Sequence, residues 1–86
     1  MGAKEITPKI LLVDDSNTIL EEERRLLEKT GMEVITATTG MEAMKMIIVE
    51  KPALVFLDLL LPEMNGDVIC KFIKEREDLK DISVVI

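Results

Sequence analysis

The sequence predicts an α/β domain built around a parallel β-sheet. Short apolar runs of strand length alternate with segments of helical periodicity over residues 9–86, and the runs at residues 9–13 and 53–57 are almost continuously apolar. Continuous apolar runs are typical of strands that are buried on both faces of a parallel sheet. Strands and helices that alternate in this way form βαβ units. We therefore expect a single βαβαβαβ domain over residues 9–86, preceded by an N-terminal lead over residues 1–8.

Length and composition set bounds on the function of this domain. The chain has 86 residues, 48% of them hydrophobic, and a net charge of −6. That length suits one domain, and that hydrophobic content argues against disorder. Nucleic-acid binding needs clustered basic residues, so we expect no nucleic-acid contact by this chain. The sequence has no apolar stretch of the ~20 residues that span a membrane, and Cys70 is its only cysteine. These features favour a cytoplasmic protein without membrane contact.

Helix-capping residues join the first predicted strand to the first predicted helix. Residues 9–13 are followed by three side chains that commonly accept hydrogen bonds from the first turn of a helix, namely Asp14, Asp15 and Ser16. Residues 17–30 then have helical spacing, and their apolar side is expected to pack on the sheet. This side consists of Ile19, Leu20, Leu26 and Leu27. Gly31 is suited to the left-handed conformation that ends many helices.

The second predicted strand is the most polar of the four. Residues 33–37 carry polar side chains, which favours an edge position in the sheet. Residues 41–50 form the next helix, which ends before Pro52 because the residue that precedes a proline disfavours helical geometry. The expected core residues of this helix are Met44, Ile47 and Ile48, and its expected outward-facing apolar residues are Met46 and Val49.

The third unit places a carboxylate inside an apolar segment. Residues 53–57 form a strand that ends at Asp58, and residues 59–66 form a loop that is rich in turn residues. A helix over residues 67–77 and a strand over residues 82–86 complete the expected elements.

The expected strand order brings three carboxylates together. If the winding of the sheet reverses after the second strand, helices cover both faces and the order is 2-1-3-4, as in flavodoxin-like domains. Ligands of such sheets bind beyond the carboxyl ends of the strands, where the order reverses. Asp14 and Asp15 follow the first strand and Asp58 follows the third. Because these two strands are neighbours in this order, the three side chains converge at one crevice.

A cluster of this kind favours metal binding and phosphoryl chemistry. Three neighbouring carboxylates repel one another, so they take up protons or bind a cation. Oxygen ligands in a sequence without His favour Mg²⁺, and a carboxylate beside such an ion can act as a nucleophile toward phosphorus. A simpler interpretation is that Asp14 and Asp15 only cap the following helix, and spacing alone favours neither interpretation. For Asp58 a function is favoured, because an unpaired carboxylate within an apolar segment is costly.

Three segments of the sequence resemble the receiver domain of bacterial two-component response regulators. They are residues 10–16 (ILLVDDS), 37–43 (ATTGMEA) and 56–66 (FLDLLLPEMNG). The acidic pair alone is a weak signal. The combination of Asp58 with Pro62, Gly66 and the acidic pair upstream is specific, and the resemblance extends over residues 9–86.

The resemblance implies a role for each group of the crevice. Asp58 would accept a phosphoryl group from a histidine kinase or a phosphotransfer protein. Asp15 and Asp58 would bind Mg²⁺ directly, and Asp14 would act mainly through water. The backbone carbonyl of Leu60 would be a further ligand of the metal.

The resemblance also implies supporting residues. Pro62 and Gly66 would shape the loop that presents Asp58, and Gly40 and Ala43 would let the second helix pack closely on the sheet. A whole receiver continues into a fourth helix, a fifth strand and a fifth helix, and it has a switch Ser or Thr and a Lys after the residues matched here. We therefore expect a sheet that is truncated after the fourth strand, in which neither Lys74 nor Lys80 is placed to substitute for that Lys.

We expect a phosphoacceptor module of two-component signal transduction, and not an enzyme. One alternative is a binding module that uses this fold without phosphorylation, and the three intact Asp residues speak against it. Another is a truncated or engineered receiver fragment that acts only as a self-associating half-domain. Because the strand at residues 82–86 would form an apolar sheet edge, we expect homo-oligomers that pair through it.

Overall fold

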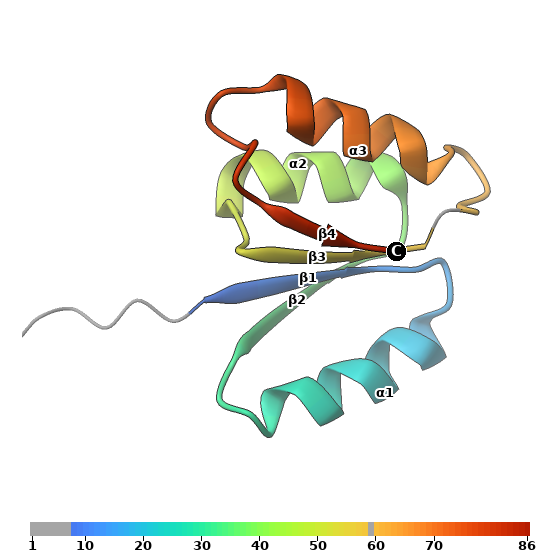
Figure 1. Cartoon of the computed structure of the whole chain (residues 1–86). Helices are drawn as coiled ribbons and strands as arrows, with labels where there is room; N and C mark the ends of the chain where they lie inside the picture. The colour runs from blue at the N-terminus through green and yellow to red at the C-terminus, as the bar shows by residue number, and fades with distance from the viewer. Residues whose placement is uncertain (1–7, 59) are drawn as a thin grey trace, which may run out of the picture.

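Four parallel strands and three helices alternate over the part of the chain that the computed structural model describes, residues 8–58 and 60–86 (Figure 1). They are β1 (Lys9–Val13), α1 (Asn17–Glu28), β2 (Glu33–Ala37), α2 (Gly40–Glu50), β3 (Leu54–Leu57), α3 (Gly66–Glu75) and β4 (Ser83–Val85). The predicted order of elements is confirmed. Except for Pro8, the predicted N-terminal lead lies outside the described residues, and so does Leu59 of the predicted loop.

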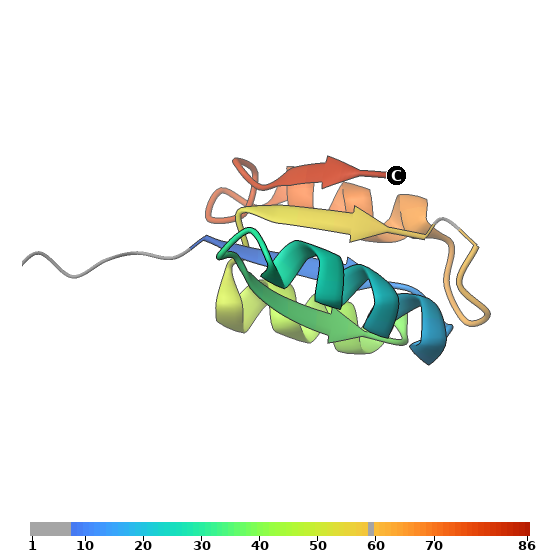
Figure 2. The same ribbon diagram turned by 90° about the horizontal axis from the view of Figure 1, so that it is seen from below.

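The sheet has the strand order β2-β1-β3-β4, with every pair parallel. This is the predicted flavodoxin-like order, and β2 lies at an edge as its polar residues indicate. Figure 2 shows the four strands running in the same direction. Val13, the last residue of β1, is in register with Ala37 of β2 and Leu57 of β3. The carboxyl ends of these three strands therefore lie at one level.

Helices cover both faces of the sheet, α1 on one face and α2 with α3 on the other (Figure 1). The core on the side of α2 and α3 consists of Leu11, Val13, Ala37, Ala43, Ile47, Val55, Leu57, Leu61, Ile69, Ile73 and Leu79. The core on the side of α1 consists of Ile10, Leu12, Leu20 and Val34. Successive residues of β1 thus alternate between two hydrophobic layers, which is why its sequence is apolar without alternation.

The helix ends differ by one to two residues from the sequence prediction. α3 ends at Glu75 because Arg76 has an extended backbone (φ −103°, ψ 129°), and its N–H donates to the carbonyl of Ile73. α1 ends at Glu28 because the hydroxyl of Thr30 donates to the carbonyl of Leu27 and competes with a further helical turn. Gly31, which follows this turn, has the predicted left-handed backbone conformation, with a φ of 87°.

The predicted facing of several apolar helix residues is wrong. In α2, Met46 packs against the core, whereas the side chain of Ile48 is exposed. The helix is centred on Ala43 and Ile47, so Ile48 lies on its outer side. In α1, Leu26 is 65% exposed and Ile19 is also exposed, because only the stripe through Leu20 faces the sheet. Val49 is exposed, as predicted. None of the helices in the described residues is long and apolar enough to span a membrane.

Candidate functional site

The backbone of the candidate site is fixed by the sheet itself. The N–H of Asp14 donates to the carbonyl of Ala37 at 3.2 Å, and the N–H of Asp58 donates to the carbonyl of Val13 at 3.0 Å. Each Asp therefore continues the hydrogen-bond ladder for one residue beyond its strand. This geometry follows from the register of β1, β2 and β3, and it gives the two carboxylates defined positions at the carboxyl end of the sheet.

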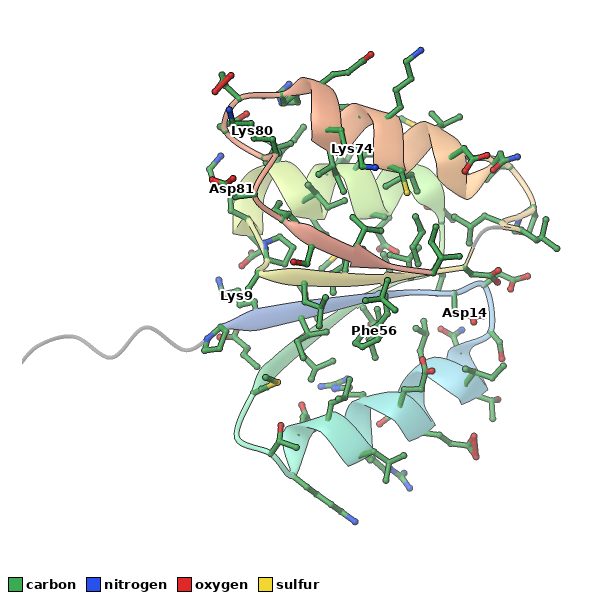
Figure 3. The ribbon with its side chains drawn as sticks, viewed as in Figure 1. Lys9, Asp14, Phe56, Lys74, Lys80 and Asp81 are labelled. Atoms are coloured by element: carbon green, nitrogen blue, oxygen red, sulfur yellow. The ribbon has the colours of Figure 1, made fainter. Side chains whose placement is uncertain are left out.

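Three carboxylates converge at this edge, as the sequence predicts. One carboxylate oxygen from each of Asp14, Asp15 and Asp58 lies within 4.8 Å of the other two. Asp14 and Asp58 are half-buried, and Asp15 is exposed. Figure 3 shows Asp14 in the turn between β1 and α1, at the end of the sheet opposite Lys9. Three negative charges at this distance repel one another, and a divalent cation would relieve the repulsion.

Backbone donors orient two of the three carboxylates. Oδ1 of Asp14 accepts a hydrogen bond from the N–H of Ser16 at 2.9 Å, and Oδ1 of Asp58 accepts one from the N–H of Leu60 at 3.0 Å. Each side chain thus has one oxygen held by its own loop, while its second oxygen is available to a ligand. Among the described residues, no hydrogen bond to the carboxylate of Asp15 is found.

Helix capping alone does not account for this arrangement. The N-cap of α1 is Ser16, whose Oγ accepts from the N–H of Ile19 at 3.3 Å. Asp14 stabilises the turn that precedes the helix, and Asp15 does not cap it. The cap is therefore Ser16, and the simpler of the two sequence interpretations does not explain the convergence of Asp15 with Asp58.

A cavity of about 480 Å³ opens beside the carboxylates. Its walls consist of Val13, Asp14, Glu23, Phe56, Leu57, Asp58, Val85 and Ile86. Acidic groups thus lie next to an apolar wall supplied by β3 and β4. This cavity leaves room beside Asp58 for a ligand larger than a single ion.

The loop after Asp58 folds back on itself. Leu60 forms an isolated antiparallel bridge with Asn65, and its side chain is 82% exposed. Asn65 is the N-cap of α3, because its Oδ1 accepts from the N–H of Asp67 at 2.9 Å. Pro62 lies exposed within this loop, and Gly66 is buried at the first position of α3. The loop-shaping role of both residues stays a prediction.

Two residues near the site carry no distinctive signal in the sequence. Glu23 projects from α1 toward the cavity wall, and Glu63 accepts a hydrogen bond from the N–H of Gly40 at 2.9 Å. Glu23 lies in a run of acidic residues, and such a run usually indicates a solvated helix face. Glu63 lies in an irregular loop, where periodicity predicts nothing about contacts.

Two lysines lie at the opposite end of the sheet from the carboxylates. Lys9 pairs with Glu50, and Lys80 pairs with Glu77 at 3.0 Å. Figure 3 shows both on the side where the strands begin, whereas Asp14 lies where β1 ends. Lys80 is therefore not placed to contact a group bound at Asp58, in agreement with the sequence prediction.

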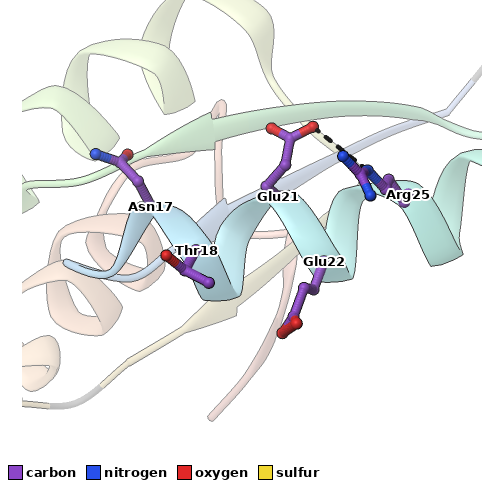
Figure 4. Close-up of a pocket in the computed structure, with 5 residues that line it drawn as sticks. All are labelled: Asn17, Thr18, Glu21, Glu22 and Arg25. Atoms are coloured by element: carbon purple, nitrogen blue, oxygen red, sulfur yellow. Dashed lines mark ion pairs between the residues drawn. The ribbon is translucent and has the colours of Figure 1, made fainter.

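A second depression lies on the outer side of α1 (Figure 4). It is lined by Asn17, Thr18, Glu21, Glu22 and Arg25. Glu21 and Arg25 form a long ion pair across one helical turn, at 3.9 Å. Exposed pairs of this kind contribute little to stability, and the depression is a solvated helix face.

Comparison with known proteins places this chain in a family. The family model of the response regulator receiver domain matches residues 10–86, so the chain belongs to the response regulator receiver domain family. Among curated relatives, the alkaline phosphatase synthesis transcriptional regulatory protein PhoP of Bacillus subtilis is 42% identical over 69 residues, which are 80% of this chain and 29% of that protein. Protein PilG of Pseudomonas aeruginosa is 35% identical over 78 residues, which are 91% of this chain and 58% of PilG.

Solved receiver structures have the same fold. The N-terminal domain of a response regulator receiver protein from Methanoculleus marisnigri is similar with a TM-score of 0.83 and 36% identity, over 88% of this chain and 62% of the other. The chemotaxis response regulator CheY4 of Vibrio cholerae is similar with a TM-score of 0.86 and 28% identity, over 92% of this chain and 66% of CheY4. The chain thus spans less than two thirds of the length of these relatives.

Proposed function

We propose that this domain is a phosphoacceptor module that takes a phosphoryl group on Asp58 from a histidine kinase or a phosphotransfer protein. The observation that carries the proposal is the convergence of Asp14, Asp15 and Asp58 within 4.8 Å at the carboxyl end of the sheet. Membership of the receiver family supports it. In this role the domain is the acceptor of the group and not an enzyme that acts on a separate substrate. A cytoplasmic location stays a prediction.

The donor atoms of the site fit Mg²⁺. All three side chains offer carboxylate oxygens, which are the ligands that Mg²⁺ prefers. Asp15 and Asp58 would bind the ion directly, Asp14 through water, and the backbone carbonyl of Leu60 would add a further oxygen. When bound, the ion would neutralise negative charge on the carboxylates and on phosphoryl oxygens.

The chain's own groups prepare Asp58 for attack on phosphorus. The N–H of Leu60 holds Oδ1, so Oδ2 is the oxygen that would form the new bond to phosphorus. With acetyl phosphate as donor, the bond between phosphorus and the acetate oxygen breaks, and acetate leaves with the electron pair. The product is an aspartyl phosphate.

Acetyl phosphate tests the proposal directly. The chain is incubated with acetyl phosphate and Mg²⁺, and the intact mass and the modified peptide are measured after trapping of the acyl phosphate. We expect one phosphoryl group on Asp58, none on the Asp58→Asn variant, and an unchanged yield for Asp67→Asn, which removes an exposed carboxylate of α3. An adduct on Ser or Thr would contradict the assignment of Asp58 as the acceptor. The absence of any adduct would contradict the proposal and favour a binding module without phosphorylation.

Self-association through β4 is a second proposal. Among the described residues β4 pairs with β3 on one side only, and Val85 and Ile86 are exposed. An apolar sheet edge readily pairs with another strand, so we expect two copies to pair here with two-fold symmetry. In light scattering, Val84→Lys should dissociate or unfold the dimer, and Glu22→Lys on α1 should not. A folded wild-type monomer at high micromolar concentration would refute this proposal.

A further inference from the structure

The loop that follows Asp58 is anchored on the first turn of α2. The N–H of Gly40 donates to Oε1 of Glu63 at 2.9 Å. Thr39 and Glu42 already cap the same turn, since Oγ1 of Thr39 accepts from the N–H of Glu42 at 3.1 Å and Oε1 of Glu42 accepts from the N–H of Thr38 at 2.9 Å. Neither of these bonds uses the N–H of Gly40, and Glu63 supplies its acceptor from a distant part of the chain.

Side chains of the loop pack closely against Gly40. An ideal Cβ added to Gly40 would lie 2.7 Å from Sδ and 3.1 Å from Cβ of Met64, and 3.3 Å from Oε2 of Glu63. Met64 also packs against the core on the side of α2 and α3. The segment that carries Glu63 and Met64 is therefore seated on α2, and Glu63 provides the polar part of that contact.

The other end of the loop orients the candidate acceptor. The N–H of Leu60 holds Oδ1 of Asp58, and Leu60 is bridged to Asn65. The N–H of Met64 donates to the carbonyl of Leu61 at 3.4 Å. These bonds join Leu60 and Met64 into one folded loop, so a shift of the segment at Glu63 would be passed to the Leu60 N–H.

We propose that Glu63 is a positioning residue for the acidic site. Its carboxylate ties the loop to the start of α2, and this contact keeps the N–H and the carbonyl of Leu60 aligned with Asp58. The effect on phosphorylation rests on the proposed function, whereas the effect on the loop itself does not. Glu63 is exposed, so its removal leaves the hydrophobic core intact.

Three variants test this role. Glu63→Ala removes the acceptor of the Gly40 N–H, Glu63→Gln keeps an oxygen that accepts the same bond, and Glu22→Ala removes an exposed carboxylate of α1 as a matched control. The first readout is amide hydrogen exchange by NMR in metal-free protein. For Glu63→Ala we expect exchange at Gly40 and Leu60 to rise about three- to tenfold, the range of one net hydrogen bond. Amides in β1 should not change.

The second readout is Mg²⁺ affinity by titration calorimetry. We expect Glu63→Ala to weaken Mg²⁺ binding about three- to tenfold with an unchanged midpoint of urea denaturation, and we expect Glu63→Gln to restore most of both readouts. The proposal is overturned if exchange at Leu60 is unchanged, if it rises equally throughout the protein, or if Glu63→Gln behaves like Glu63→Ala. If wild-type protein binds no Mg²⁺, the proposed function fails, and the exchange data still decide whether Glu63 positions the loop.

Discussion

Replacement of Asp58 by Asn should stabilise the metal-free protein, although it removes the candidate phosphoacceptor. In Asp58→Asn the side-chain oxygen can still accept the hydrogen bond from Leu60, so the main change is the loss of one negative charge. Two unit charges 4.8 Å apart, the upper limit of the separations in the cluster, repel by about 0.9 kcal/mol in bulk water. Two such pairs involve Asp58, with Asp14 and with Asp15. Because all three groups contact solvent, the screened estimate applies, and we expect a gain of roughly 1–2 kcal/mol.

Urea denaturation in EDTA and in Mg²⁺ measures this gain. With a slope of ~1 kcal/mol per M for a small domain, the midpoint of Asp58→Asn in EDTA should lie about 1–2 M above that of the wild type. Mg²⁺ at ten times its dissociation constant should stabilise the wild type by about 1.4 kcal/mol and the variant by much less. Asp81→Asn, a loss of charge at the far end of the sheet (Figure 3), should change neither value.

A midpoint in EDTA that does not rise would refute the electrostatic reasoning. It would mean that the three carboxylates do not repel one another in the folded protein. If Mg²⁺ raised the free energy of unfolding of Asp58→Asn as much as that of the wild type, the cation would bind away from the cluster.

Three further variants, with Val49→Ala as a control, test the packing and one ion pair. Gly40→Ala should disturb the loop despite the better helix propensity of Ala, and NMR shifts at the amides of residues 60–65 should report it. Ile47→Ala should lower the free energy of unfolding by about 2–5 kcal/mol in urea, whereas Val49→Ala, at an exposed position, should change it little. The Lys51 ammonium that donates to Asp78 holds the pKa of that carboxyl below its ordinary value of 3.8. The resulting stability is complete above that value and is lost as the pH falls through the folded pKa, so Asp78→Asn should flatten the acid side of the stability profile.

The fold class could be predicted because it follows from periodicity, and the convergence of the carboxylates could be predicted once the flavodoxin-like strand order is assumed. Continuous apolar runs at β1 and β3 indicate strands covered on both faces, and parallel strands end at the same edge. Asp14 and Asp58 each follow such a strand, so their proximity needs only the strand order. No side-chain detail enters this part of the prediction.

The facing of the apolar helix residues could not be predicted in the same way. α2 is apolar on most sides, so the periodicity does not define which stripe is buried. The structure shows that the fully buried Ala43 and Ile47 define the inner side of α2, and that Met46 packs inward and Ile48 outward. In α1, Leu26 has an apolar side chain of the kind found in cores, but it is exposed because it lies beside the stripe that contacts the sheet.

The contact of Glu63 with Gly40 could not be predicted from the sequence for a different reason. It joins an irregular loop to a helix end, and neither partner belongs to a repeating pattern. Only the close approach of the Met64 and Glu63 side chains to Gly40, which the structure defines, shows why a glycine stands at the start of α2.

The backbone hydrogen bonds of the sheet continue from the strands into Asp14 and Asp58. The acidic site can therefore form only when these strands have paired during folding. The three carboxylates come from two chain segments, one after β1 and one at the end of β3, with α1, β2 and α2 between them, so the cluster exists only after the ends of this long stretch of chain have met. Bringing these ends together lowers the conformational entropy of the chain before any stabilising contact between them has formed. A partly folded chain in which β3 has not joined β1 would have no cation site. Mg²⁺ should therefore bind only after this pairing and slow its loss, and the metal dependence of the unfolding rate would report on the β1–β3 junction.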